Sequence, residues 1–277
     1  MIQKLRYATV ADIGVYDMTF YDKRKKEELV KFCEQHKISF LPAKNRIDIY
    51  KLKNNDFYKV QGEERERMIR TFSIQPEARI FVKDTLERFH LRSHDEIRLI
   101  MDNDRIQGVV HIIDYNNEFI KVEFYRALYN FERNLRKILI REGLTNEDFL
   151  AWVEEQGETG NEQDKHFWNS RLSKLSTKNE VDKRETINPF QAFYLNELLQ
   201  YAIDIGVLPD LKYIDKKAIT DLRNSIMHAN DVTSVTVEGG ETTIYHFDNL
   251  KEFVENANRF FSAYVYLEDK LRFSEGG

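Results

Sequence analysis

The sequence has little cysteine and no long apolar segment, and each absence excludes a class of protein. Cys33 is the only cysteine among 277 residues, so the chain can form no intramolecular disulfide. Cys33 and His36 fall short of the four ligands of a structural zinc site, and we expect no metal or cofactor. No apolar stretch approaches the roughly 20 residues of a membrane-spanning helix, and the first residues lack a signal peptide's apolar core. We expect a cytoplasmic protein that does not enter a membrane.

The sequence also lacks an excess of basic charge. Its 42 Lys and Arg residues stand against 47 Asp and Glu residues, which gives a formal net charge of -5. A basic field over the whole protein, of the kind that attracts nucleic acid, is therefore excluded, and any basic cleft must be local. The sequence is well supplied with core residues, since 42% are hydrophobic and 19 Phe and 14 Tyr add large side chains. It is long enough for one large domain or two modest ones.

The first 115 residues alternate strand-like runs with helical ones, a pattern typical of an α/β domain. The segments 38–47 (ISFLPAKNRI) and 97–106 (IRLIMDNDRI) align without gaps, which indicates an internal duplication. Runs rich in β-branched and aromatic residues predict strands near residues 37–42, 46–52, 96–101 and 106–113, and helices are expected at 25–37 and 84–92.

The segment DEIRLIMDNDRIQGVVHIIDYN (95–116) resembles the closing part of a CBS (cystathionine β-synthase type) module, and TVADIG (9–14) resembles the strand that enters one. Such modules pair into a disc whose clefts often hold adenine nucleotides, so the resemblance implies a CBS-like tandem over residues 1–115. The family usually has a hydroxyl residue for the phosphate three positions before an Asp for the ribose. Here Asp114 fits the ribose position and His111 replaces the hydroxyl, while the first copy lacks the Asp. The resemblance implies at most one nucleotide cleft, or a degenerate pair that serves dimerisation.

After Asp114 the apolar periodicity becomes helical. Hydrophobic residues recur every three or four positions from Ile120 to Ile138, behind a candidate N-cap at Asn117. Four such helices predict a bundle over residues 116–277, and the chain as a whole is expected to be a multi-domain α+β protein. The three later helices are predicted at residues 188–206, 216–229 and 253–271.

Two polar inserts interrupt this predicted bundle. Residues 154–186 are too polar for a core and too long for a simple connection, so we expect an excursion with a short helix near residues 166–175. Residues 232–247 hold two β-branched runs around EGGE, which predicts a small β-hairpin. At the second helix, Asn188 and Pro189 suit the start and Gly206 suits the position after the end.

The segment LRNSIMHAND (222–231) places an Arg, an Asn and a His near the end of the third predicted helix. Asn224 and His228 are four residues apart and share a face, whereas Arg223 lies roughly 140° around the helix from His228. Side chains of these types can cleave RNA without a metal, because His moves protons and Arg stabilises the charge of a phosphorane-like transition state. The polar edge of an ordinary amphipathic helix is the alternative.

Arg-Asn followed by three residues and His, on the third helix of a predicted four-helix bundle, resembles the Arg-x4-6-His motif of HEPN domains. The segment YRALYNFERNLRKILIRE (125–142) is similar to the opening HEPN helix, and the resemblance covers residues 118–273. It implies a metal-independent endoribonuclease acting as a homodimer, in which Arg223, Asn224 and His228 of both protomers line one cleft. A toxin or antiviral (abortive-infection) effector controlled by the CBS-like region would suit this domain order.

Three arginines of the first predicted helix are candidates for binding RNA. Arg133, Arg136 and Arg141 would supply the local positive surface that the net charge does not show, or form i to i+4 pairs on a solvated face. Two other functions stay open: a non-catalytic sensor or adaptor that binds nucleotide or RNA, and a structural dimerisation protein.

Overall fold

The structure, a computed structural model, describes residues 2–36, 38–89, 97–159, 161–176, 190–209, 214–228, 232–233, 235–238, 242–245 and 247–273. The fold is a mixed α+β fold, as predicted at this coarse level. The chain divides into two compact units, each built from two separate segments. Unit 1 holds Met1–Phe124 and Ser225–Glu255, and unit 2 holds Tyr125–Asn224 and Asn256–Gly277. The division at residue 115 that the sequence suggests stays a prediction.

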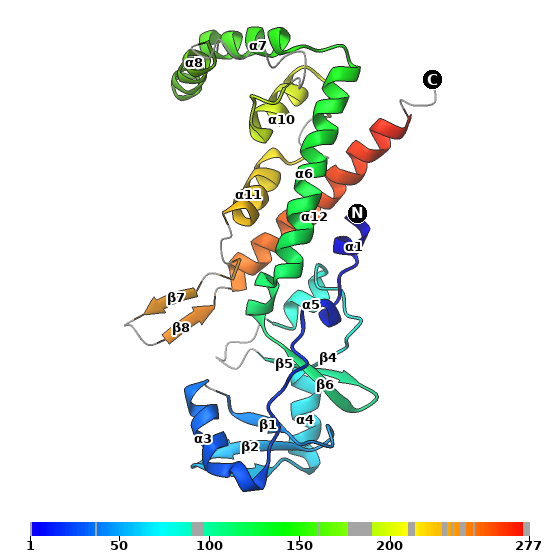
Figure 1. The fold of residues 1–277 in the computed structure, drawn as a ribbon, viewed down its shortest axis with the longest axis vertical. Helices are drawn as coiled ribbons and strands as arrows, with labels where there is room; N and C mark the ends of the chain where they lie inside the picture. Colours follow the sequence, from blue (N-terminus) through cyan, green and yellow to red (C-terminus); the bar gives the residue numbers. More distant parts are fainter. Residues whose placement is uncertain are drawn as a thin grey trace. The chain divides into compact units, whose positions relative to one another are not determined.

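Unit 1 combines short helices with small sheets (Figure 1). Its helices are α1 (Ile2–Arg6), α2 (Val10–Ile13), α3 (Lys26–Gln35), α4 (Gly62–Phe72) and α5 (Lys83–Glu87), with the 3-10 helices η1 (Lys23–Lys25) and η2 (Ile112–Asn116). One antiparallel sheet holds β1 (Phe40–Pro42), β2 (Ile49–Lys53) and β3 (Asp56–Lys59). A second sheet holds β4 (Ser73–Ile74), β5 (Arg98–Asp102) and β6 (Arg105–Val110), with β4 parallel to β5. The predicted hairpin is β7 (Val235–Glu238) and β8 (Thr242–Tyr245).

The two aligned segments of the sequence each begin an antiparallel hairpin, β1-β2 and β5-β6. The turns differ in length. Asn103 and Asp104, both at positive φ, join β5 to β6, whereas residues 43–48 join β1 to β2. The backbone N–H of Ile106 donates to the carbonyl oxygen of Arg46 at 2.7 Å, so the two hairpins meet at their turns.

The core of unit 1 follows from the apolar residues of these elements. In one cluster, Cys33 of α3 packs with Leu41 of β1 and Phe57 of β3. Burial raises the pKa of Cys33 to about 11, so its thiol stays neutral and acts as a small apolar group. Arg98 of β5 is fully buried as well, and its guanidinium donates to the carbonyl oxygen of Arg88.

Unit 2 is built from helices (Figure 1). Helices are present at the four places where the sequence predicts the helices of a bundle, as α6, α10, α11 and α12, and the bundle itself stays a prediction. Within unit 2, α6 and α12 lie side by side, and the ring of Phe131 lies 5.4 Å from Phe260 and 6.4 Å from Tyr264. The helices that contribute to unit 2 are α6 (Glu118–Arg141), α7 (Asn146–Thr159), α8 (Glu162–Ser176), α10 (Leu195–Asp204), α11 (Lys216–Met227) and α12 (Phe247–Phe273).

The second bundle helix begins later than predicted. α10 starts at Leu195, and Phe190 before it has a φ of 62°, which no continuous α-helix allows. The carboxylate of Glu197 accepts a hydrogen bond from the backbone N–H of Tyr194 at 2.8 Å, which fixes the first turn. The prediction of a start at residue 188 was therefore wrong, and residues 188–189 themselves lie outside the described residues. The predicted end is confirmed, since α10 stops at residue 204.

Helix α7 is not among the predicted helices, although its start carries a recognisable pattern. The hydroxyl of Thr145 accepts from the backbone N–H of Asp148 at 3.3 Å, and the Asp148 carboxylate accepts from the backbone N–H of Thr145 at 2.8 Å. This reciprocal pair is a capping box, which the sequence TNED at 145–148 would have indicated. Helix α8 covers the short helix predicted at residues 166–175.

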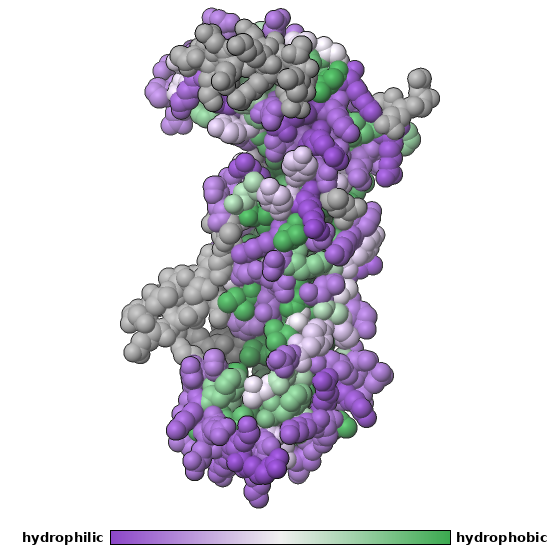
Figure 2. Space-filling view, viewed as in Figure 1, coloured by the Kyte–Doolittle hydropathy of each residue, from purple (hydrophilic) through white to green (hydrophobic). Residues whose placement is uncertain are grey.

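Within the described part of the chain, no helix combines the length and the apolar character that a membrane crossing requires. Hydrophilic residues cover most of the visible face of the molecule, with hydrophobic residues in smaller patches between them (Figure 2).

Candidate functional site

Helix α11 carries the Arg-Asn-x3-His motif. The helix starts after Asp215, whose carboxylate accepts a hydrogen bond from the backbone N–H of Ala218 at 2.9 Å and so caps the first turn. Arg223 and Asn224 are half-buried on the last part of α11. His228 directly follows the last residue of the helix and is exposed.

Arg223 and Asn224 line a hollow of about 260 Å³ in unit 2, here called the Arg223 hollow. The Nη1 atom of Arg223 donates to Oδ1 of Asn224 at 3.3 Å, which orients both side chains. The hydroxyl of Thr220 is buried at the same place and makes no hydrogen bond to the described residues. The guanidinium of Arg223 and the side-chain amides of Asn196 and Asn224 line the hollow and are donors of the kind that hold a phosphate. The remaining lining residues are Tyr194, Leu195 and Asn196.

The three residues of the motif do not all line the Arg223 hollow. The division between the two units falls between Asn224 and Ser225, inside α11. Arg223 and Asn224 belong to unit 2, whereas His228 belongs to unit 1 and is not among the residues that line the hollow. The hollow therefore brings together the first two of the three predicted catalytic residues.

A cluster that the sequence did not reveal lies beside the hollow. Arg171 of α8 donates from Nε and Nη2 to the two carboxylate oxygens of Glu197, at 2.6 and 3.1 Å. Glu197 is only 1% exposed, so this pair holds α8 to the start of α10. The partners are 26 positions apart, and nothing in their spacing pairs them. The Glu three residues after Tyr194 was the available indication of a helix start, which the predicted start at residue 188 overlooked.

Of the three arginines proposed to bind RNA, Arg136 bonds to two other parts of unit 2. It forms an ion pair with Glu132, one turn earlier on α6. Its guanidinium also donates to the carbonyl oxygens of Phe190 and Phe193, at 3.3 and 3.4 Å. These bonds anchor the segment before α10, so Arg136 has a structural role in unit 2.

Arg133 and Arg141 are exposed on α6. Arg141 donates to the carbonyl oxygen of Leu271 at 2.9 Å, near the end of α12. Burial and the charge of Glu268 raise the pKa of Tyr264, and the positive charge of Arg133 opposes that rise. The RNA-binding role of all three arginines stays a prediction.

His111 and Asp114 cap the 3-10 helix η2. The Asp114 carboxylate accepts from the backbone N–H of His111 at 2.7 Å, and Nδ1 of His111 accepts from the backbone N–H of Ile113 at 3.3 Å. Burial and the charge of Arg98 lower the pKa of His111 to about 4. Burial raises the pKa of Asp114 to about 6, and the hydrogen bond from His111 opposes this rise. The fold thus disfavours the charged form of both side chains, and their nucleotide-binding role stays a prediction.

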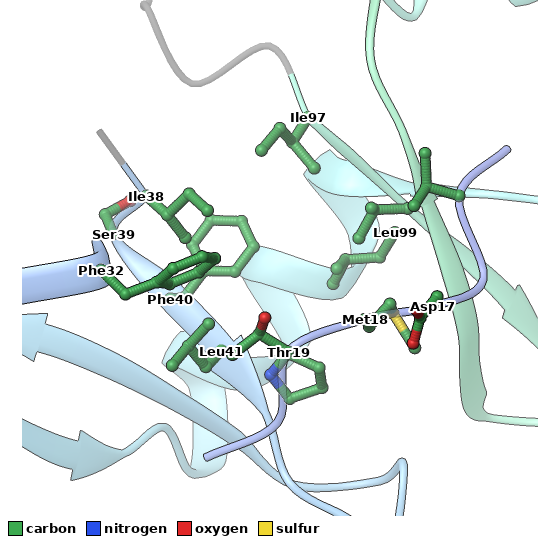
Figure 3. Close-up of a pocket in the computed structure, with 13 residues that line it drawn as sticks. Asp17, Met18, Thr19, Phe32, Ile38, Ser39, Phe40, Leu41, Ile97 and Leu99 are labelled. Atoms are coloured by element: carbon green, nitrogen blue, oxygen red, sulfur yellow. The ribbon is translucent and has the colours of Figure 1, made fainter. Parts of the chain in front are cut away.

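Unit 1 contains a second hollow of about 190 Å³, here called the apolar cavity. Figure 3 shows Phe32 and Phe40 on one side of it and Leu99 on the other. Neither His111 nor Asp114 is among its lining residues. The residues that line it are Val15, Asp17, Met18, Thr19, Phe32, Ile38, Ser39, Phe40, Leu41, Pro42, Ile97, Leu99 and Val109.

Within the described ranges, no three His, Cys, Asp or Glu side chains gather in a way that could hold a metal ion. Comparisons of the chain with protein-family models, with curated proteins and with solved structures found no match. The residues of the Arg223 hollow and of α11 therefore carry the functional proposal on their own.

Proposed function

We propose that this protein is a metal-independent endoribonuclease of the HEPN type that acts as a homodimer. One observation carries the proposal: Arg223 and Asn224 share a polar hollow, on the helix that His228 directly follows. A side-chain guanidinium that lines a hollow together with hydroxyl and amide groups suits a phosphate, because charge-assisted hydrogen bonds to phosphate are among the strongest in proteins.

The reaction uses the RNA's own 2′-hydroxyl as the nucleophile. The 2′ oxygen forms a bond to phosphorus while the bond from phosphorus to the 5′ oxygen breaks, which leaves a 2′,3′-cyclic phosphate and a free 5′-hydroxyl. His228 of one protomer accepts the 2′ proton, and His228 of its partner gives a proton to the 5′ oxygen. Arg223 stabilises the negative charge that develops on the phosphate oxygens, and Asn224 orients Arg223 through their hydrogen bond.

The N-terminal region supplies control or dimerisation in this proposal. The two aligned hairpins, β1-β2 and β5-β6, support a CBS-like tandem over residues 1–115. An adenine nucleotide bound near Asp114 would favour one of two states of the dimer, as expected of a toxin or antiviral effector that is inactive until triggered. Nucleotide affinity should weaken in Asp114→Ala, and unchanged affinity would remove Asp114 from the site.

Cleavage of a labelled single-stranded RNA by the purified full chain tests the enzyme, with and without EDTA and with adenine nucleotides added. We expect cleavage that survives EDTA and leaves a cyclic phosphate. Arg223→Ala should lower the rate about 100-fold or more, and His228→Ala by a similar factor. Exposed residues of the same types, His166 on α8 and Arg272 on α12, provide matched alanine controls that should leave the rate unchanged.

A second function, binding of nucleotide or RNA without cleavage, is favoured by a specific observation. His228 does not line the hollow that contains Arg223, so a phosphate held there would have no described proton acceptor beside it. RNA that binds with an affinity dependent on Arg223, but is never cleaved under any nucleotide supplement, would establish this function. Equal cleavage by the wild type and both variants would remove the motif from the mechanism.

A further inference from the structure

Tyr194 is an exposed aromatic residue at the start of α10, where short polar side chains are favoured. It is the N-cap of α10 and makes no side-chain capping bond. Ser, Thr, Asp and Asn are favoured there, because their short side chains accept hydrogen bonds from the first N–H groups of the helix. The residue is 60% exposed, so burial does not account for an aromatic side chain here. A large exposed aromatic group at such a position suggests recognition of a ligand.

The surrounding residues hold this ring in place. The backbone N–H of Tyr194 is bonded to Glu197, and Glu197 is buried against Arg171. The guanidinium of Arg171 lies over the Tyr194 ring, 4.5 Å from its centroid, and also donates to the carbonyl oxygen of Ala192 at 3.0 Å. The ring and the guanidinium therefore form a preorganised pair, here called the Tyr194 platform, and Tyr194 as a residue stays largely exposed.

The Tyr194 platform belongs to the wall of the Arg223 hollow, which Tyr194 and Arg223 both line. A phosphate at Arg223 would thus place its attached nucleoside next to an exposed aromatic ring. Unpaired bases stack on aromatic side chains with little dependence on sequence, because every base has a π face. Bases inside an RNA duplex are already stacked on each other and are not available.

We infer that the Tyr194 platform is a base-stacking subsite, which holds an unpaired base of the RNA next to the phosphate at Arg223. The inference rests on the proposed function, since the phosphate at Arg223 is part of that proposal. It adds a binding element that is independent of His228 and of cleavage. Tyr194 positions the substrate and takes no part in proton transfer.

Binding to the full chain is measured by fluorescence anisotropy with a labelled 2′-fluoro RNA decamer, which has no 2′-hydroxyl and cannot be cleaved by this mechanism. Tyr194→Phe keeps the ring and should bind like wild type. Tyr194→Ser removes the ring and introduces a favoured N-cap residue, so α10 is retained. We expect Tyr194→Ser to weaken binding about fivefold or more, the lower end of what loss of one stacked base produces.

Tyr7 offers a matched control. It is 46% exposed, and the guanidinium of Arg79 lies 4.4 Å from its ring centroid, but it does not line the hollow. Tyr7→Ala should bind like wild type. A decamer with abasic residues should bind wild type and Tyr194→Ser equally, and a blunt RNA duplex should bind both weakly.

The inference is overturned if wild type fails to bind the decamer, if Tyr194→Ser binds as tightly as wild type, or if the loss persists unchanged on abasic RNA. Failure of the proposed nuclease gives a different result, because unmodified RNA would then stay intact while the decamer still binds through Tyr194. Cleavage that is unaffected by Tyr194→Ser, together with unchanged binding, would remove the platform and leave the nuclease standing.

Discussion

The Arg223 hollow of unit 2 and the apolar cavity of unit 1 differ in how they are built. Five of the six residues that line the first carry a polar side-chain group, and a buried ion pair between Arg171 and Glu197 stabilises the start of α10 beside it. Apolar side chains such as Leu41 and Leu99 dominate the second. One site is thus suited to a charged ligand, whereas the other depends on close packing. The comparison indicates that a buried ion pair stabilises the surroundings of the first site, whereas the burial of apolar side chains stabilises those of the second.

Removing one charge beside the Arg223 hollow should have the largest effect on stability. Glu197→Gln leaves the guanidinium of Arg171, only 13% exposed, without its carboxylate. The loss should be about 3–5 kcal/mol in the free energy of unfolding, measured by urea titration. Asp221→Asn breaks the exposed pair with Lys217 and should cost under about 1 kcal/mol. Equal losses of unfolding free energy in both variants would show that the Arg171–Glu197 ion pair does not stabilise this region.

Removing apolar volume from the apolar cavity should cost slightly less. Leu41 is 3% exposed and lines the cavity, and Leu41→Ala enlarges it. The expected loss is about 3 kcal/mol, because the missing side chain adds a cavity term to the lost burial. Ile47→Ala, at a position that is 40% exposed, should change the same urea titration by less than about 1 kcal/mol. A Leu41→Ala variant as stable as Ile47→Ala would show that the packing of Leu41 against the apolar cavity does not stabilise the fold.

Adding one methyl group behind the apolar cavity should have a smaller effect. A Cβ at Gly108 of β6 would lie 2.7 Å from the backbone carbonyl oxygen of Val15, and the main chain there must move. Gly108→Ala should therefore cost about 1–3 kcal/mol. At Gly157 a Cβ would meet the side-chain amide of Asn169, which must rotate and give up its hydrogen bond to the carbonyl oxygen of Gly157. That loss, about 1 kcal/mol, is offset by the higher helix propensity of alanine inside α7, so Gly157→Ala should be close to neutral. Thermal unfolding of both variants measures the difference.

The smallest expected effect is a pH dependence of the unfolding free energy. It comes from His111 and Asp114 at η2, whose charged forms burial disfavours. The folded protein keeps the Asp114 proton up to about pH 6, against about 3.8 ordinarily, so this group makes stability fall as pH rises between those values. His111 titrates near pH 4 in the fold and near 6.5 ordinarily, so it makes stability rise with pH over its range. Between about pH 4 and 6 the two slopes oppose each other.

Single substitutions should separate the pH dependence of stability that comes from Asp114 from the one that comes from His111. His111→Asn leaves the slope of Asp114, so relative to wild type its melting temperature should fall as pH rises from about 4 to 6. Asp114→Asn leaves the slope of His111 and should show the opposite trend over the same range. Melting curves at half-unit pH steps measure both. Differences from wild type that do not vary with pH would show that neither group is desolvated.

The helices of the bundle were predictable because each depends on local periodicity. The recurrence of apolar residues gave α6 and α12, and the β-branched runs gave the β7-β8 hairpin. The start of α10 was misplaced because Asn188 and Pro189 also suit a helix start, and the left-handed conformation of Phe190 is not indicated by its residue type. The Arg171–Glu197 pair joins distant parts of the chain, so no spacing could predict it. Arg223 and Asn224 were found as candidates, but the hollow they line also depends on the packing of α10 against α11.

The two-segment construction of each unit has a consequence for synthesis of the protein. The chain passes from one unit to the other at residues 124–125, 224–225 and 255–256, which lie within α6, α11 and α12. Unit 1 therefore cannot close on the ribosome until its second segment has been made, even though most of it emerges first. Unit 2 is completed only by residues 256–277, which include most of α12. Truncation at any of the three crossings would cut a helix and leave an incomplete core, so neither unit corresponds to a continuous fragment that could be expressed alone.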